Sequence, residues 1–255
     1  MSLAVMKMKG TIWCLHGAVG CAADWDGWRL DGWAIRRVDL WRFLSCCPMT
    51  LTEFGGALNR EAEVSEGKHV LMGYSMGGRL GLHALVANGP WSAAIMISTH
   101  SGLEDSDERA RRRAADAEWA ALVLRGEWAD FLRKWNAQPV LQSATDAVGP
   151  DSLWMADRHR LADRRREIAR SFMDWSLGAQ SPLWDPLASC PVPTLWVAGE
   201  RDAKFCALAG RAAGAMGAAP AVIAPGAGHR VPWENPDWLT ARVRKFLSKL
   251  ESAPQ

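Results

Sequence analysis

The chain lacks several features that would place it in common classes of protein. Its 255 residues contain no C-x-x-C pair and no Cys/His spacing typical of a metal site, although six cysteines are present. No apolar run approaches the ~20 residues of a membrane-spanning helix. The opening stretch MSLAVMKMKG has no apolar segment as long as that of a secretory signal. These absences predict a cytoplasmic protein that binds no metal and does not contact the membrane.

An excess of one charge is also missing, since the formal net charge is only +2. Nucleic-acid binding through bulk electrostatics is therefore not expected. Lysine is scarce, because 7 of the 30 basic residues are lysine and 23 are arginine. Arginine can hold a carboxylate through two parallel hydrogen bonds, so this composition fits a small anionic substrate. Nothing in the sequence indicates a cofactor, and the oligomeric state stays open.

Apolar residues make up 49% of the chain, which is enough for a large core in one α/β domain with an insertion. Short apolar segments alternate with amphipathic ones, which predicts a parallel sheet with right-handed helical crossovers. The predicted strands are 12–15, 34–40, 69–74, 93–98, 193–199 and 221–224. The predicted helices of this part are 50–65, which Thr50 or Thr52 can cap, 79–87 and 237–250.

The stretch 103–183 breaks this alternation. It contains helical runs at 107–125, 127–137 and 152–176 but no convincing strand. An all-helical insertion between two strands of a sheet is typical of a lid. The expected organisation is therefore a core of residues 1–102 and 184–255, with residues 103–183, referred to below as the lid, inserted into it.

A serine between glycines marks the first candidate for chemistry. In HVLMGYSMGGRLG, residues 69–81, the segment 73–77 fits G-x-S-x-G, directly after a predicted strand and before a predicted helix. In that motif the serine sits on a strained strand-to-helix turn, and the glycines leave room for the neighbouring backbone. The pattern indicates that Ser75 is a nucleophile or base, although the motif alone also fits an ordinary glycine-rich turn.

A catalytic serine requires a base, and the base requires an acid that orients it. Asp202 follows the strand 193–199, and His229 lies in the glycine- and proline-rich loop after the strand 221–224. The order Ser, Asp, His along the chain is that of the α/β-hydrolase arrangement. The three residues are predicted to form a catalytic triad, with Asp185 and Glu200 as the next candidates for the acid.

Two backbone N–H groups are expected to form an oxyanion hole. One belongs to Met76, the residue after the serine, and the other to Ala18, in the loop after the first strand. His16, in the same loop, is interpreted as a structural residue that takes no part in proton transfer.

Taken together, these segments resemble the α/β-hydrolase superfamily over nearly the whole chain. The narrower resemblance is to the 2-succinyl-6-hydroxy-2,4-cyclohexadiene-1-carboxylate synthases, which eliminate pyruvate in menaquinone biosynthesis. LHGAVGCAADWD, GYSMGGRL, VAGERDAKF and PGAGHRVPWENP are similar to the loops that carry the reaction. The segments SGLEDSDERARRRAADAEWA, FLRKWNAQPV and LGAQSPLWDPL are similar to that family's lid and are the more specific evidence.

The resemblance implies a substrate with three carboxylates and a reaction in which a ring proton is removed and pyruvate leaves. It also implies that arginines bind the carboxylates, because buried carboxylates without cations would be expensive. The expected substrate-binding residues are Arg79, Arg112, Arg160, Tyr74 and Trp135. The assignment of Arg160 competes with several other arginines on the same predicted helix.

Two residues depart from the family pattern. Ala18 stands where a bulky residue is common, and Asn136 stands where tyrosine is common. Both positions are expected to face the substrate. An ester or thioester hydrolase with the same triad remains an alternative function, and a binding protein without catalytic activity is a third.

Overall fold

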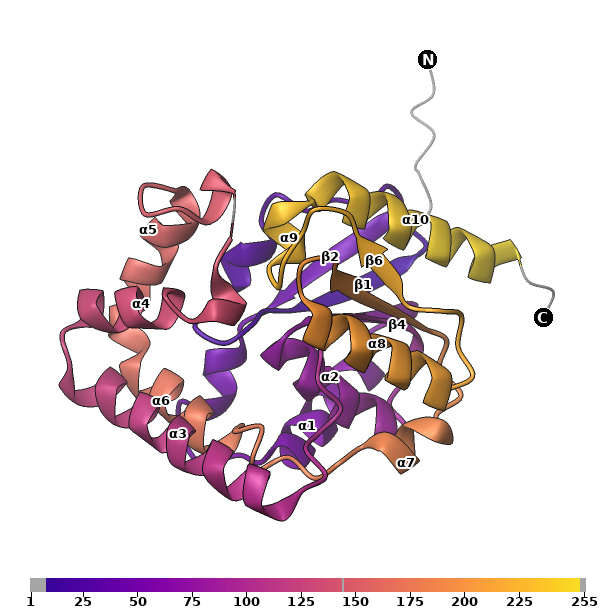
Figure 1. Cartoon of the computed structure of the whole chain (residues 1–255). Coiled ribbons are helices and arrows are strands. Elements are labelled where there is room, and N and C mark those ends of the chain that lie inside the picture. The colour runs from indigo at the N-terminus through magenta and orange to yellow at the C-terminus, as the bar shows by residue number, and fades with distance from the viewer. Residues whose placement is uncertain (1–7, 144, 253–255) are drawn as a thin grey trace.

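Six short apolar segments form one parallel sheet (Figure 1). The computed structural model describes residues 8–143 and 145–252. The strand order is β2-β1-β3-β4-β5-β6, and every neighbouring pair is parallel. The strands are β1 (Gly10–Leu15), β2 (Trp33–Val38), β3 (Lys68–Tyr74), β4 (Trp91–Ile97), β5 (Thr194–Gly199) and β6 (Val222–Ala224). The predicted α/β class and its parallel sheet are confirmed.

Successive strand residues point to opposite faces of this sheet and enter two separate cores. In β1, Trp13 and Leu15 pack toward helices α1 (Leu51–Glu63), α2 (Met76–Val86) and α8 (Ala203–Ala215). Ile12 and Cys14 pack toward α10 (Pro236–Ser252) and the short helix η1 (Ala22–Trp25). Because both faces are covered, the strands read as nearly continuous apolar runs.

Several predicted boundaries shift by a few residues in the structure, and one predicted cap is found. Strand 34–40 ends at Val38, because the Asp39 side chain accepts a hydrogen bond from Trp41 N at 3.1 Å and starts the helix η2 (Leu40–Leu44). Thr50 caps α1, as one of the two predicted alternatives, in a capping box with Glu53. Helices α7 (Trp184–Ala188), α8 and α9 (Val231–Glu234) were not predicted from the sequence.

The segment between β4 and β5 is helical. It contains α3 (Ser106–Arg125), α4 (Trp128–Asn136), α5 (Leu153–Arg160) and α6 (Arg165–Asp174), with short 3-10 turns at Pro139–Leu141, Asp146–Val148 and Leu161–Arg164. No strand occurs within its described residues. These helices lie to one side of the sheet (Figure 1), so residues 103–183 are retained as a proposed lid.

The predicted helical run 152–176 is broken into two helices. The turn at Leu161–Arg164 separates α5 from α6, and Arg164 leaves the helical conformation with φ −109° and ψ 20°. The break lets the two helices bury different sides. Arg158 of α5 contacts Asp24 of the core, whereas Ile168 of α6 enters the main apolar core.

The parallel direction of the strands brings four loops to one edge of the sheet. Ser75 follows β3, Ser98 and His100 follow β4, Asp202 follows β5, and His229 follows β6. Ligands bind at this carboxyl edge in open α/β sheets. In the described part of the chain, no helix is long and apolar enough to cross a membrane. The cytoplasmic location stays a prediction.

The turn from β3 to α2 is strained at the serine. Ser75 has φ 52° and ψ −110°, a backbone conformation that residues other than glycine rarely adopt. A Cβ at Gly77 would lie against the backbone carbonyl groups of Leu15 and His16, and a Cβ at Gly73 would lie 2.6 Å from Gly78 Cα. The two glycines therefore let the turn approach β1 and its own helix closely.

We expect Gly77→Ala to lower both the melting temperature and the activity, because its new methyl group must displace backbone atoms of the β1 loop. Gly210→Ala is the matched control. Gly210 lies in α8 with open space where its Cβ would be, so alanine should stabilise the helix by up to ~1 kcal/mol. Thermal unfolding of both variants tests this, and equal melting temperatures would contradict the close approach.

Candidate active site

Ser75, His229 and Asp202 meet in one hydrogen-bonded row. His229 Nε2 lies 3.0 Å from Ser75 Oγ, and His229 Nδ1 lies 2.8 Å from Asp202 Oδ2. His229 is buried, with 5% of its surface exposed. A carboxylate on one nitrogen fixes the tautomer, so the other nitrogen is left free to take the serine proton. The arrangement can activate Ser75 as a base or as a nucleophile.

Contacts from three elements hold this row in place. Ser75 N donates to Ile97 O of β4 at 2.9 Å, and Ser98 Oγ donates to His229 O at 2.9 Å. Asp202 caps α8 by accepting from Phe205 N at 3.2 Å, and the Phe205 ring packs edge-on against His229 at 4.5 Å. The same aspartate therefore begins a helix and orients the histidine.

A cavity of about 210 Å³, referred to below as the Ser75 cavity, opens above the serine. Ala18 and Met76, the predicted oxyanion residues, both line it, as do Trp135 and Leu141 from the lid segment. Val19, next to Ala18, has φ 54°. Such a backbone conformation is costly for a β-branched residue and is often found where a loop is shaped for function.

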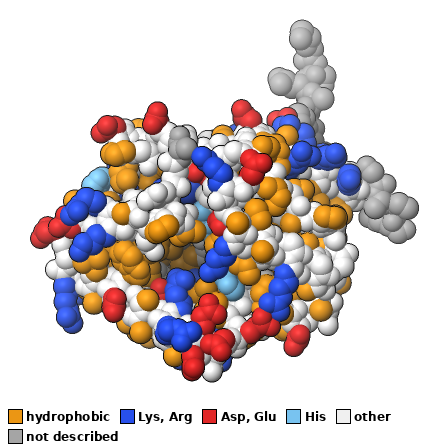
Figure 2. Space-filling model, viewed as in Figure 1, with side chains coloured by type: hydrophobic (Ala, Val, Ile, Leu, Met, Phe, Trp, Pro, Cys, Tyr) orange, Lys and Arg blue, Asp and Glu red, His pale blue; other side chains and the backbone are white. Residues whose placement is uncertain are grey.

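Three cations line the Ser75 cavity, namely Arg79, Arg112 and Lys204, and no carboxylate is among its described lining residues. Figure 2 shows Lys and Arg side chains beside an apolar hollow between the lid and the core. An anionic ligand is the natural partner of such a cavity.

Arg79 is buried without a carboxylate partner among the described residues. Its guanidinium donates to Trp175 O at 2.7 Å and to Gln180 Oε1 at 3.2 Å, and both acceptors are neutral. Burial, with the nearby charge of Arg112, lowers the pKa of Arg79 to about 9, which leaves it cationic at neutral pH. Arg112 itself is half-exposed and pairs with Asp116 at 2.9 Å.

His100 also lines the Ser75 cavity and is neutral. Burial and the nearby cation Lys204 lower the pKa of His100 to about 4. Its Nδ1 accepts a hydrogen bond from Gly102 N at 2.9 Å, so the proton is on Nε2. His100 thus adds a neutral hydrogen-bond donor to a cavity that is lined by three cations.

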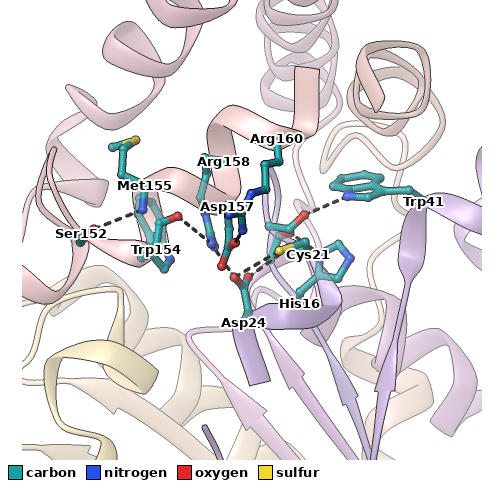
Figure 3. A network of polar contacts seen from close by, with 12 residues as sticks. His16, Cys21, Asp24, Trp41, Ser152, Trp154, Met155, Asp157, Arg158 and Arg160 are labelled. Atoms are coloured by element: carbon teal, nitrogen blue, oxygen red, sulfur yellow. Dashed lines mark hydrogen bonds and ion pairs between the residues drawn. The ribbon is translucent and has the colours of Figure 1, made fainter. Parts of the chain in front are cut away.

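The structure does not bring Arg160 to the Ser75 cavity. Its side chain is 78% exposed and pairs with Asp157 one helical turn away, so the expectation for Arg160 is corrected. The inward-facing arginine of α5 is Arg158, which pairs with the buried Asp24 at 2.6 Å (Figure 3). Two residues along a helix point to nearly opposite sides, and the sequence alone did not resolve which of them faced inward.

Tyr74 lines a neighbouring space rather than the Ser75 cavity. A small cavity of about 20 Å³, referred to below as the side cavity, is lined by Tyr74, Arg158 and Arg230 among others. It shares Ala18, Trp135 and Leu141 with the Ser75 cavity. These three shared residues place the two cavities next to each other.

Two further expectations concern residues around these cavities. Asn136 lines neither cavity, contrary to expectation, and accepts a hydrogen bond from Arg230 through its Oδ1 atom. His16 is fully buried, and its Nε2 accepts from Leu40 N at 3.3 Å. Desolvation by burial lowers the pKa of His16, which fits the structural role predicted for it.

Sequence reasoning missed His100, Lys204 and Arg230. All three follow strands at the carboxyl edge: His100 comes after β4, Lys204 stands two residues beyond Asp202, and Arg230 directly follows His229. Their place after a strand was a usable signal, but the fold was needed to show which of them turn inward. Among residues 8–143 and 145–252, no cluster of three or more His, Cys, Asp or Glu could hold a metal ion.

The sequence profile of the Alpha/beta hydrolase family matches residues 14–242. The chain belongs to this family. A 2-succinyl-6-hydroxy-2,4-cyclohexadiene-1-carboxylate synthase from Klebsiella pneumoniae is 30% identical to this alpha/beta hydrolase over 244 residues, or 92% of each chain. A putative synthase of the same name from Bacillus subtilis is 32% identical over 71% of this chain and 66% of its own. The family and these relatives identify the chain as an enzyme.

Solved structures agree on the fold of this alpha/beta hydrolase. MenH from S. aureus superposes with a TM-score of 0.82 at 22% identity, over 96% of both chains. A thermophilic esterase from Thermogutta terrifontis superposes with a TM-score of 0.75 at 20% identity, over 96% of this chain and 92% of its own. One fold thus accommodates differently named proteins, so the reaction has to be argued from the site.

We expect Asp202→Asn to lower the rate by about 10⁴-fold, because the amide favours the wrong tautomer of His229. Glu200→Gln is the matched control, since Glu200 is an exposed carboxylate two residues earlier that accepts a hydrogen bond from Gly226 N. Rates of both variants against pH test the assignment. Loss of activity in Glu200→Gln with a normal rate in Asp202→Asn would reverse the roles.

The lowered pKa of His100 also predicts a pH dependence of stability. The unfolded chain takes up a proton near pH 6.5, whereas the folded chain does so only near pH 4. The free energy of unfolding should therefore decrease as the pH falls through this window. Thermal midpoints between pH 7 and 5 should fall less steeply for His100→Gln than for the exposed control His159→Gln. Identical slopes would argue against a buried neutral His100.

Proposed function

We propose that the chain is a lyase that eliminates pyruvate from 2-succinyl-5-enolpyruvyl-6-hydroxy-3-cyclohexene-1-carboxylate. The observation that carries the proposal is the set of cations around Ser75. Arg79, Arg112 and Lys204 line its cavity without a lining carboxylate, which suits a substrate with several carboxylates and gives a neutral ester no advantage. The names of the relatives from Klebsiella and Bacillus support the same reaction.

In the proposed reaction, Ser75 acts as a base. Its Oγ removes the ring proton next to the succinyl ketone while His229 takes up the serine proton and Asp202 stabilises the resulting imidazolium. The electron pair left on the ring carbon forms a double bond to the next ring carbon, and the existing ring double bond shifts one position toward the carbon that carries the enolpyruvyl oxygen. The bond from the ring to the enolpyruvyl oxygen breaks, and the leaving enolate takes up a proton to become pyruvate.

Negative charge builds up on the ketone oxygen during proton removal. The backbone N–H groups of Ala18 and Met76 are proposed to stabilise it, since both residues line the cavity beside Ser75. The cations are proposed to hold the carboxylates so that the ring carbon faces Ser75. No acyl-enzyme forms, so the same groups serve elimination here and would serve hydrolysis with an ester substrate.

Release of pyruvate from the enolpyruvyl substrate tests the proposal directly. The purified protein should produce pyruvate in a coupled assay, and Ser75→Ala should abolish nearly all of it while leaving the melting temperature unchanged. Hydrolysis of p-nitrophenyl acetate should be slow, because this ester has no carboxylate for the cations to orient. Absence of pyruvate release, with rapid hydrolysis of neutral esters, would favour the ester hydrolase instead.

We expect Arg112→Ala to lower kcat/KM for the tricarboxylate by an amount equivalent to about 1.5–3 kcal/mol, the range for a hydrogen bond to a charged group. Its rate on p-nitrophenyl acetate should scarcely change. Arg160→Ala is the matched control, because Arg160 is an exposed lid arginine outside the cavity. Equal losses in both variants, or an equal loss on the neutral ester, would argue against carboxylate binding by Arg112.

A further inference from the structure

A second buried cation stands next to the catalytic histidine in the chain. Arg230 directly follows His229 and is only 4% exposed. Its single hydrogen bond to a described residue goes to Asn136 Oδ1, and its guanidinium lies 4.6 Å from the centre of the Trp154 ring. Both neighbours are uncharged. Arg230 is therefore a buried positive charge held by a neutral amide and an aromatic face.

Two other arginines near the site have a carboxylate partner, whereas Arg230, like Arg79, has none among residues 8–143 and 145–252. Arg158 pairs with the buried Asp24, and Arg112 pairs with Asp116. The nearby Glu234 accepts hydrogen bonds from Gly228 N and from Ser143 instead. A buried charge without a partner destabilises the fold, and an anionic ligand that pairs with it would offset this cost.

The place of Arg230 indicates that role. It lines the side cavity with Tyr74, whose hydroxyl makes no hydrogen bond to a described residue. Arg158 and Asp24 line the same cavity, but they form an ion pair with each other and their charges offset. The side cavity meets the Ser75 cavity at Ala18, Trp135 and Leu141. Of these three shared residues, Ala18 contributes only a methyl group.

We infer that Arg230 is a specificity-determining residue that binds a substrate carboxylate in the side cavity. The carboxylate replaces Asn136 Oδ1 as the acceptor of the guanidinium, and the phenol of Tyr74 donates to the same anion. The inference deepens the proposed function, on which it rests for the identity of the substrate. A substrate held by Arg79 and Arg230 has carboxylates on both sides of the atom that faces Ser75.

A structural role for Arg230 makes a different prediction. If Arg230 only fastens the lid to the histidine loop through Asn136, then Asn136→Ala should reproduce the effect of removing the guanidinium. If Arg230 binds a carboxylate, Asn136→Ala should leave anion affinity unchanged or raise it, because the variant frees the guanidinium from its resting partner. The two variants together separate positioning of the lid from binding of the ligand.

The test measures binding of succinate by calorimetry in the Ser75→Ala background, with uncharged succinamide as the reference ligand. We expect Arg230→Gln to weaken succinate binding at least tenfold and to leave succinamide binding unchanged. Arg230→Lys should lose several-fold, since an ammonium keeps the charge without the planar fork. The exposed Arg160→Gln should have no effect. Melting temperatures show whether each variant is folded, and Arg230→Lys carries the test if Arg230→Gln does not fold.

Three results would overturn the inference: no binding of succinate to the Ser75→Ala protein, equal affinity in Arg230→Gln, or a loss in Asn136→Ala as large as that in Arg230→Gln. None of these results depends on turnover. Absence of pyruvate release would therefore remove the proposed function while the carboxylate site at Arg230 is still judged by its own measurement.

Discussion

The parallel direction of all six strands is the constraint on which the rest of the structure depends. It brings the ends of β3, β4, β5 and β6 to one edge, where Ser75, Ser98, Asp202 and His229 meet although they are far apart in sequence. The strained turn at Ser75 is tolerated because the strand before it and the helix after it are both buried and cannot relax separately. The packing of this strand and helix thus offsets the free-energy cost of the strained backbone at Ser75.

Burial of positive charge is the second organising feature. Arg79 and Arg230 are both buried and both bonded to neutral acceptors, whereas Arg158 is neutralised by Asp24. In a low-dielectric site an unneutralised guanidinium attracts an anion more strongly than it would in water. The fold therefore favours anions at this site, although the formal net charge of the whole chain is only +2.

The lid segment connects these two features. Trp135 packs against Trp119 and Phe172 within the lid and also lines both cavities, so an aromatic cluster sets the position of the cavity wall. Asn136, one residue later, meets Arg230 from the histidine loop. Packing of the lid helices and the shape of the space around Ser75 are consequently coupled.

The sequence by itself determined the parallel α/β core, the helical nature of the insertion and the order Ser75, Asp202, His229. These features could be predicted because apolar periodicity and glycine-rich turns are local patterns that span only a few residues. The meeting of these three residues follows from the strand order, while their catalytic role stays a prediction. Only the tertiary structure decided which of Arg158 and Arg160 turns inward and that Asn136 meets Arg230 instead of lining a cavity. It also showed that His100 and Lys204 line the Ser75 cavity. The reason is that a side chain's surroundings depend on contacts between segments a hundred residues apart, and no local pattern in the sequence records those contacts.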